Sequence, residues 1–203
     1  MENNYSKELA NRIKMFLDGD QWRYGFNEEG GYFRLDLSIK GRGINRLRYL
    51  IIVNGDSFNV YATSPVGADC NDKKMMETMA EYIARANNKL NNGGFQLDYR
   101  NGEIRFKAFV DCEDCEPSIA VIRNSIHYPA AVFESYSYGI AGIIFQDLTA
   151  EEAIRISEYA KVRSILQGKG LSEEEIDETI AKLRNRASGS ATDKKAGATG
   201  GDG

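Results

Sequence analysis

The stretch from Asn71 to Val110 constrains the fold most, because two different hydrophobic periods follow one another within it. The first half carries apolar residues at three- and four-residue steps, which is the spacing of one face of an α-helix. That face consists of Met75, Met79, Tyr82, Ile83, Ala86 and Leu90. The second half alternates apolar and polar residues around Asn101-Gly102, a dipeptide typical of a tight type I′ turn. The sequence therefore predicts a helix that leads directly into a β-hairpin.

Polar and glycine residues mark the two ends of this helix. Asn71 or Asp72 can accept the free amide hydrogens at its start. Gly93 and Gly94 can adopt the positive φ that closes a helix end. We therefore expect the helix to end there and the hairpin to begin at Phe95.

The segments before the central helix follow a period of two, the period of β-strands. Residues 32–39 alternate most regularly, with polar residues between the apolar residues Phe33, Leu35, Leu37 and Ile39. Residues 46–64 are typical of two further strands joined by a polar turn at residues 54–57. Together with a short strand at residues 22–26, they predict a four-strand antiparallel meander. An amphipathic helix is expected before it, at residues 6–17.

A long apolar segment follows the hairpin. Pro117 suits the start of a helix, and Pro129 removes one backbone donor from that helix. We therefore expect a kink, or a new helix beginning near Tyr128. Residues 139–145 are compatible with either a buried helix or a late strand, because short apolar runs do not show a decisive period.

Two capping boxes predict a pair of helices at the C-terminal end. Thr149 and Glu152, and then Ser172 and Glu175, have the spacing in which side chain and backbone cap each other. Residues 188–203 contain no aromatic or large aliphatic residue, so a disordered tail is expected there.

This order of elements predicts an α+β fold: an antiparallel sheet with helices packed on one face, followed by a C-terminal helical pair. A chain of 203 residues with 42% apolar residues can bury one good core. We therefore predict one α+β domain at residues 1–148, a helical extension at residues 149–187 and the tail at residues 188–203.

Composition narrows the classes of partner. A formal charge of −4 and a pI near 5.2 give no broad positive field, so no nucleic-acid partner is expected. Charged residues occur throughout the first thirty positions, and no later stretch is an uninterrupted membrane span. We expect a cytoplasmic protein with no membrane partner. The odd number of three cysteines also argues against a secreted disulfide framework.

The Cys112-x-x-Cys115 motif is the sharpest local signal for chemistry, because such a pair can bind a metal or cycle between thiol and disulfide. A zinc site needs two more ligands, and only Cys70 and His127 remain, without paired spacing. The acidic residues between the two cysteines would raise a thiol pKa. We interpret the cysteines as structural or incidental and expect no metal and no cofactor; the alternative is a metal- or thiol-dependent enzyme.

A basic cluster surrounds one predicted strand connection. Its members are Lys40, Arg42, Arg46 and Arg48. Such a cluster can meet an acidic partner or RNA, or it can be a solvated loop. Tyr32, Arg34 and Tyr61 offer rings and charge for base stacking, but tyrosines in a sheet are mostly core and cross-strand pairs.

The helix end at residues 86–90, the strand with Phe95, Leu97 and Asp98, and the following residues 102–106 resemble the YbjN-like family, whose fold is shared with type III secretion chaperones. The resemblance extends over residues 5–145. It implies a protein-binding or regulatory module that forms a homodimer and holds an extended or amphipathic segment over its sheet or a groove at the edge. It brings no catalytic residue.

The alternation also predicts where a partner would bind. Leu47, Tyr49, Ile51 and Val53 belong to the face that helices cover, so Leu50 and Ile52 point to the opposite face. The predicted partner-binding residues are Leu50, Ile52, Tyr61 and Phe109. Exposed apolar side chains on a sheet require a partner, so we expect a non-enzymatic protein-binding module.

Overall fold

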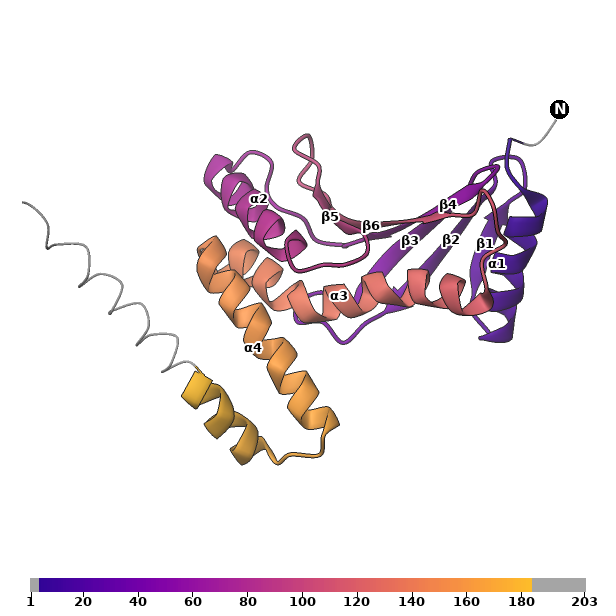
Figure 1. The fold of residues 1–203 in the computed structure, drawn as a ribbon. Coiled ribbons are helices and arrows are strands. Elements are labelled where there is room, and N and C mark those ends of the chain that lie inside the picture. The colour runs from indigo at the N-terminus through magenta and orange to yellow at the C-terminus, as the bar shows by residue number, and fades with distance from the viewer. Residues whose placement is uncertain (1–3, 184–203) are drawn as a thin grey trace, which may run out of the picture. The chain divides into compact units, whose positions relative to one another are not determined.

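The computed structural model describes residues 4–183 (Figure 1). The predicted tail at residues 188–203 lies outside these residues. Within the described part, the fold is α+β, as the order of elements predicts.

Six strands form one antiparallel sheet in the order β1-β2-β3-β4-β6-β5. The strands are β1 Tyr24–Asn27, β2 Tyr32–Ser38, β3 Arg46–Val53, β4 Ser57–Thr63, β5 Gly94–Leu97 and β6 Ile104–Asp111. The first four strands are the predicted meander. The later hairpin joins the meander through β6, which pairs with β4 over its whole length.

The helices are α1 Lys7–Gly19, α2 Lys73–Asn87, α3 Ile119–Gln146 and α4 Ala150–Gly168. A further helix begins at Glu173 and continues to Leu183, the last described residue. Ser6 and Asp72 cap α1 and α2 through their side-chain oxygens. Both capping boxes are present: Thr149 and Glu152 exchange backbone and side-chain hydrogen bonds, and Ser172 and Glu175 do the same.

One face of the sheet carries the core. The side chains that point to this face are buried beneath α1, α2 and α3, and Figure 1 shows α3 running along the sheet with α1 at one end and α2 at the other. The buried strand residues include Phe33, Leu35, Leu47, Tyr49, Ile51, Val53, Phe58, Val60, Ala62, Ile104, Phe106 and Ala108. Alternation therefore leaves the other side chains of these strands on a face that α1–α3 do not cover.

The chain divides into two compact units within α4: the first ends at Ser157 and the second begins at Glu158. In the first unit, Ser157 contacts Tyr82 of α2 and Gly139 of α3. In the second, the guanidinium of Arg163 contacts the carboxylates of Glu173 and Asp177, which fasten α4 to the helix that follows.

The helix α3 is one continuous helix of 28 residues with Pro129 inside it, and it includes residues 139–145, for which a buried helix was one of the two expected alternatives. No new helix begins near Tyr128, and residues 139–145 are helical rather than a strand. Nearly every side of its second half is buried. Burial on all sides removes the amphipathic period by which a helix is recognised.

The connection between β5 and β6 is wider than the predicted type I′ turn. That turn needs a positive φ at both central residues, but only Gly102 has one, at 71°, while Asn101 does not. The loop is instead closed by the Asp98 amide, which donates to the Glu103 carbonyl at 2.9 Å, and by the Gly102 amide, which donates to the Asp98 carbonyl at 2.7 Å. Tyr99 therefore lies in the loop and is 60% exposed.

The helix α2 ends at Asn87, before the glycines expected to close it. The side-chain amide of Asn87 accepts from the Phe95 amide at 2.8 Å and donates to the Phe95 carbonyl at 3.0 Å, so it fastens the start of β5. Gly93 has a φ of 77°, and a Cβ there would lie 2.3 Å from the Lys107 carbonyl oxygen. Gly93 therefore allows the chain to pass close to β6 as it enters β5, and it does not cap the helix α2.

Candidate partner-binding face

The sheet register places the predicted binding residues on one face. Leu50 lies between Arg34 and Tyr61 on the neighbouring strands, and Ile52 lies between Tyr32 and Asn59. Phe109 lies on the other side of Asn59. We call the face opposite the helices the open face, and its residues include Tyr32, Arg34, Asp36, Ser38, Arg46, Arg48, Leu50, Ile52, Asn59, Tyr61, Thr63, Arg105, Lys107, Phe109 and Asp111.

The four predicted residues differ in how far they are exposed. Leu50, Ile52 and Tyr61 are half-buried by their neighbours, whereas Phe109 is 53% exposed. The register brings Leu50 directly opposite Tyr61, and it places Ile52 and Phe109 on either side of one strand. The four side chains thus form two adjacent rows across β3, β4 and β6 rather than isolated surface contacts.

A polar atom lies unsatisfied in one of these rows. The side-chain oxygen of Asn59 is buried and accepts no hydrogen bond from any residue of the described chain. Unsatisfied buried acceptors are uncommon in folded proteins and cost free energy. This one lies in the row of Ile52 and Phe109.

Positive side chains lie against the aromatic rings of the open face. The Arg105 guanidinium is 5.3 Å from the centre of the Tyr61 ring, and the Lys107 ammonium is 5.7 Å from it. The Arg34 guanidinium is 4.8 Å from the centre of the Tyr32 ring. These are cation–π distances, so each of the two rings has at least one cation against it.

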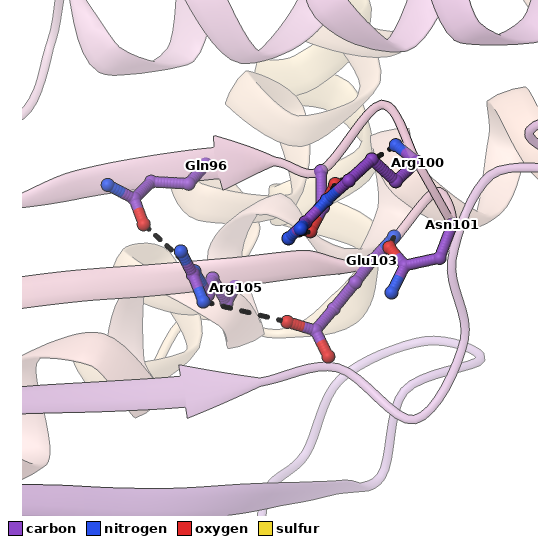
Figure 2. A network of polar contacts seen from close by, with 6 residues as sticks. Gln96, Arg100, Asn101, Glu103 and Arg105 are labelled. Carbon is purple, nitrogen blue, oxygen red and sulfur yellow. Dashed lines mark hydrogen bonds and ion pairs between the residues drawn. The ribbon is translucent and has the colours of Figure 1, made fainter.

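A polar network at the end of the hairpin holds Arg105 in this position (Figure 2). The Gln96 side-chain oxygen accepts a hydrogen bond from Arg105 Nε at 2.9 Å, and a Glu103 carboxylate oxygen lies 3.9 Å from the Arg105 guanidinium. Asn101 supports Glu103 by accepting a hydrogen bond from its amide at 3.0 Å. Arg105 is therefore oriented by Gln96 of β5 and by Glu103 of the loop.

A depression of about 420 Å³ opens on this face over β2, β3 and β4. Its polar wall contains Arg34, Arg48, Thr63, Asp36 and Glu103, and Leu50 contributes an apolar side chain to the wall. The depression is therefore lined both by charged side chains and by the predicted apolar residue Leu50, so a ligand bound in it would contact a charged and an apolar surface.

The charges around the depression are not balanced. Asp36 forms an ion pair with Arg46 at 2.7 Å, so its carboxylate is paired with an arginine that does not line the depression. Within the described residues, no carboxylate lies at ion-pair distance from Arg34, Arg48 or Lys107. The open face is thus locally positive, although the whole chain carries a formal charge of −4.

The four basic residues between positions 40 and 48 lie in two different places in the structure. The amides of Lys40 and Arg42 donate to the side chains of Glu134 and Ser137 at 2.8 and 2.9 Å, so this connection lies along α3. Arg46 and Arg48 instead lie on the open face. The four residues therefore do not form one basic patch.

The cysteine pair lies after β6. Burial, together with Cys115 and nearby aspartates, raises the pKa of the Cys112 thiol above its ordinary value, which disfavours a reactive thiolate. Cys115 is exposed, and in the part of the chain from residue 4 to residue 183 no three His, Cys, Asp or Glu side chains are grouped so as to hold a metal. His127 packs edge-on against the rings of Trp22 and Phe16.

Comparison of the sequence with protein-family models and with curated proteins gave no match to either. None of the helices in the described residues has both the length and the apolar character that crossing a bilayer requires.

The charged residues of the site that were not among the predicted binding residues include Arg34, Arg48, Arg105 and Lys107. The sequence contains a signal for the last two, because Arg105, Lys107 and Phe109 alternate with the buried Ile104, Phe106 and Ala108. That signal identifies their shared face, but it does not reveal that β6 lies beside β4.

Proposed function

We propose that this protein is a non-enzymatic module that binds a segment of a protein partner across the open face of its sheet. The observation that carries the proposal is the pair of apolar rows formed by Leu50, Ile52, Tyr61 and Phe109 on the face that α1–α3 leave uncovered. Apolar side chains grouped on a sheet surface are typical of an interaction site.

The magnitude of the available burial supports this role. Because Leu50 and Ile52 are already half-buried, removing the rest of both side chains from water contributes only roughly 1.5 to 3 kcal/mol before the costs of association. Tyr61 and Phe109 add aromatic area beside them, and aromatic residues are enriched at the centres of interfaces. The unsatisfied oxygen of Asn59 offers a partner one acceptor, once its side chain rotates outward.

The proposal places the protein in the cytoplasm as a homodimer. The homodimer comes from the resemblance to the YbjN-like family. The cytoplasmic location comes from the charged residues throughout the first thirty positions, and the three free cysteines suit a reducing compartment. A role for Cys112 and Cys115 in catalysis is the less favoured alternative, because burial raises the pKa of the Cys112 thiol.

Affinity capture from the native cell, followed by quantitative mass spectrometry, tests the binding role. The informative variant is Leu50→Glu with Ile52→Lys, which places charge in both apolar rows without reaching the core. The matched control is Met15→Glu with Phe145→Lys, because Met15 and Phe145 are 67% and 65% exposed on α1 and α3.

We expect both variants to keep the circular dichroism of the wild type, and only the open-face variant to lose bound proteins. Sedimentation velocity of the same variants reports self-association. If the open-face variant folds and captures the same proteins as the wild type, the open face is not the binding surface. If it unfolds while the control does not, Leu50 and Ile52 are core residues and the proposal fails.

A further inference from the structure

We propose that the segment bound by the open face is an acidic peptide with interspersed apolar side chains, and that Arg34 and Arg48 hold one of its carboxylates. This inference rests on the proposed function and adds the chemistry of the partner. Three observations carry it: the placement of the two arginines, the uncompensated charge and the occupied aromatic rings.

The register places Arg34 and Arg48 on neighbouring strands of the open face. Arg34 lies directly opposite Leu50, and Arg48 lies two residues before Leu50 on the same strand and face. Diagonal neighbours of this kind are about 7–8 Å apart across a sheet, within reach of long side chains. Both arginines line the depression, so one carboxylate can receive hydrogen bonds from both.

The charges of the chain itself leave these arginines available. Asp36 lies directly opposite Arg48, but its carboxylate oxygen is 2.7 Å from Arg46 instead. Glu103, the other acidic residue of the depression, is oriented by Asn101 and lies nearest to Arg105. Together with Arg46 and Arg105, the arginines of the depression surround only these two carboxylates, so a carboxylate from a partner would reduce the excess of positive charge.

The apolar side chains of the open face favour a partner that also carries apolar side chains. Leu50 separates the arginines from Ile52, so a segment lying along β3 would place a carboxylate and an apolar side chain side by side. Residues 188–203 of the chain contain no large apolar side chain. These residues therefore do not complement the face, and the occupant is a segment of another protein.

The aromatic residues favour a peptide over a nucleic acid. Single-stranded nucleic acids bind by stacking bases on exposed ring faces. The rings of Tyr32 and Tyr61 are already engaged by Arg34 and by Arg105 with Lys107.

Fluorescence anisotropy tests the proposal with a short labelled peptide in which Glu alternates with Leu and Phe. Two matched peptides replace the Glu residues by Lys, or the apolar residues by Ser. We expect the full-length protein to bind the first peptide at least about tenfold more tightly than either of the others, because charge-assisted hydrogen bonds and apolar burial both contribute.

The variant Arg34→Glu with Arg48→Glu should weaken binding of the acidic peptide by about tenfold or more. The control is Arg123→Glu with Arg155→Glu, which makes the same change in net charge at two exposed arginines on the helices α3 and α4. It should bind like the wild type. The milder Arg34→Gln with Arg48→Gln repeats the test if the first variant does not fold.

Three results would overturn the proposal: equal affinity for the acidic and basic peptides, an equal loss in both charge variants, or tighter binding of a labelled oligouridine than of the acidic peptide. If the acidic peptide does not bind, but the capture of cellular proteins still depends on Leu50 and Ile52, only the proposed chemistry of the partner is wrong. If capture is independent of those two residues as well, the binding role itself is wrong.

Discussion

The hydroxyl of Tyr49 donates a hydrogen bond to the backbone carbonyl oxygen of Ile126, with 3.0 Å between the two oxygens. Tyr49 lies on β3, and Ile126 lies on α3 three residues before Pro129. Proline in a helix removes a backbone donor and disturbs the carbonyl groups of the preceding turn. Burial raises the pKa of Tyr49 well above its ordinary value, so the hydroxyl keeps its proton and remains a donor. The sheet thereby stabilises α3 beside its proline.

The variant Tyr49→Phe should lower the free energy of unfolding by about 1–3 kcal/mol, because it leaves a buried carbonyl without this donor. Urea denaturation measures the change. Tyr99→Phe is the control, since Tyr99 is 60% exposed in a loop, and it should be nearly neutral. Equal stability of the two variants would show that the hydrogen bond to Ile126 contributes nothing.

The variant Gly139→Ala should destabilise the first unit by about 1–3 kcal/mol, because α2 and α3 approach too closely there for an extra methyl group. A Cβ at Gly139 would lie 2.4 Å from the Tyr82 hydroxyl oxygen. That hydroxyl bonds the Tyr136 carbonyl at 2.7 Å and lies 2.9 Å from Ser157 Oγ, so it cannot move freely.

Gly19→Ala is the matched control for Gly139, because a Cβ at the end of α1 would meet nothing within 4 Å. Thermal unfolding of both variants measures the difference. A Gly139 variant as stable as the Gly19 variant would mean that the helices separate at little cost.

The carboxyl group of Asp98 should titrate far below an ordinary aspartate. Hydrogen bonds from the Arg100 side chain and amide lower the pKa of Asp98 from 3.8 to about 2. Because folding lowers this pKa, the contribution of Asp98 to stability is fully present above pH 3.8 and is lost as the pH falls through about 2.

Carboxyl chemical shifts followed by NMR measure the titration of Asp98. Arg100→Ala should move its midpoint back toward 3.8, whereas Arg85→Ala, which removes the partner of Glu81, should not. A midpoint near 3.8 in the wild type would show that the Arg100 contact does not persist in solution.

The variant Cys112→Ser with Cys115→Ser should change Tm by no more than about 4 °C, because substitutions away from a packed core have small effects. The Cys112 thiol is only half-buried, and Cys115 is exposed. Differential scanning calorimetry measures Tm, and elemental analysis of the wild type measures bound metal. A large fall in Tm, or a stoichiometric metal, would instead favour a metal- or thiol-dependent site.

The sequence predicts the open face well because only one face of this sheet is buried. Along β3, buried Leu47, Tyr49, Ile51 and Val53 alternate with residues that are not buried, so the period of two records directly which side chains face the helices. The alternation alone is therefore enough to assign Leu50 and Ile52 to the opposite face.

Two features could not be predicted in this way. The period of a strand shows which side chains share a face of the sheet, but it does not show which strand lies beside it. The contact of Arg105 and Lys107 with Tyr61 requires β6 to pair with β4, and the sequence pattern does not reveal that pairing. The helix α3 is buried on most sides of its second half and contains Pro129, so neither its period nor its composition indicates its full length.

The pairing of β4 with β6 also has a consequence for how the chain folds. The strands of the meander pair with their immediate successors, so β1–β4 can assemble by short-range encounters along the chain. Closing β4 onto β6 must wait for the intervening segment with α2 and β5 to loop out, which costs entropy before any contact is gained. The binding residues lie on both sides of the β4–β6 pairing. Leu50 and Ile52 belong to the meander, which forms first, whereas Phe109 belongs to β6, which joins it later. A growing chain therefore presents its binding surface without Phe109, Arg105 and Lys107 until the second hairpin has docked.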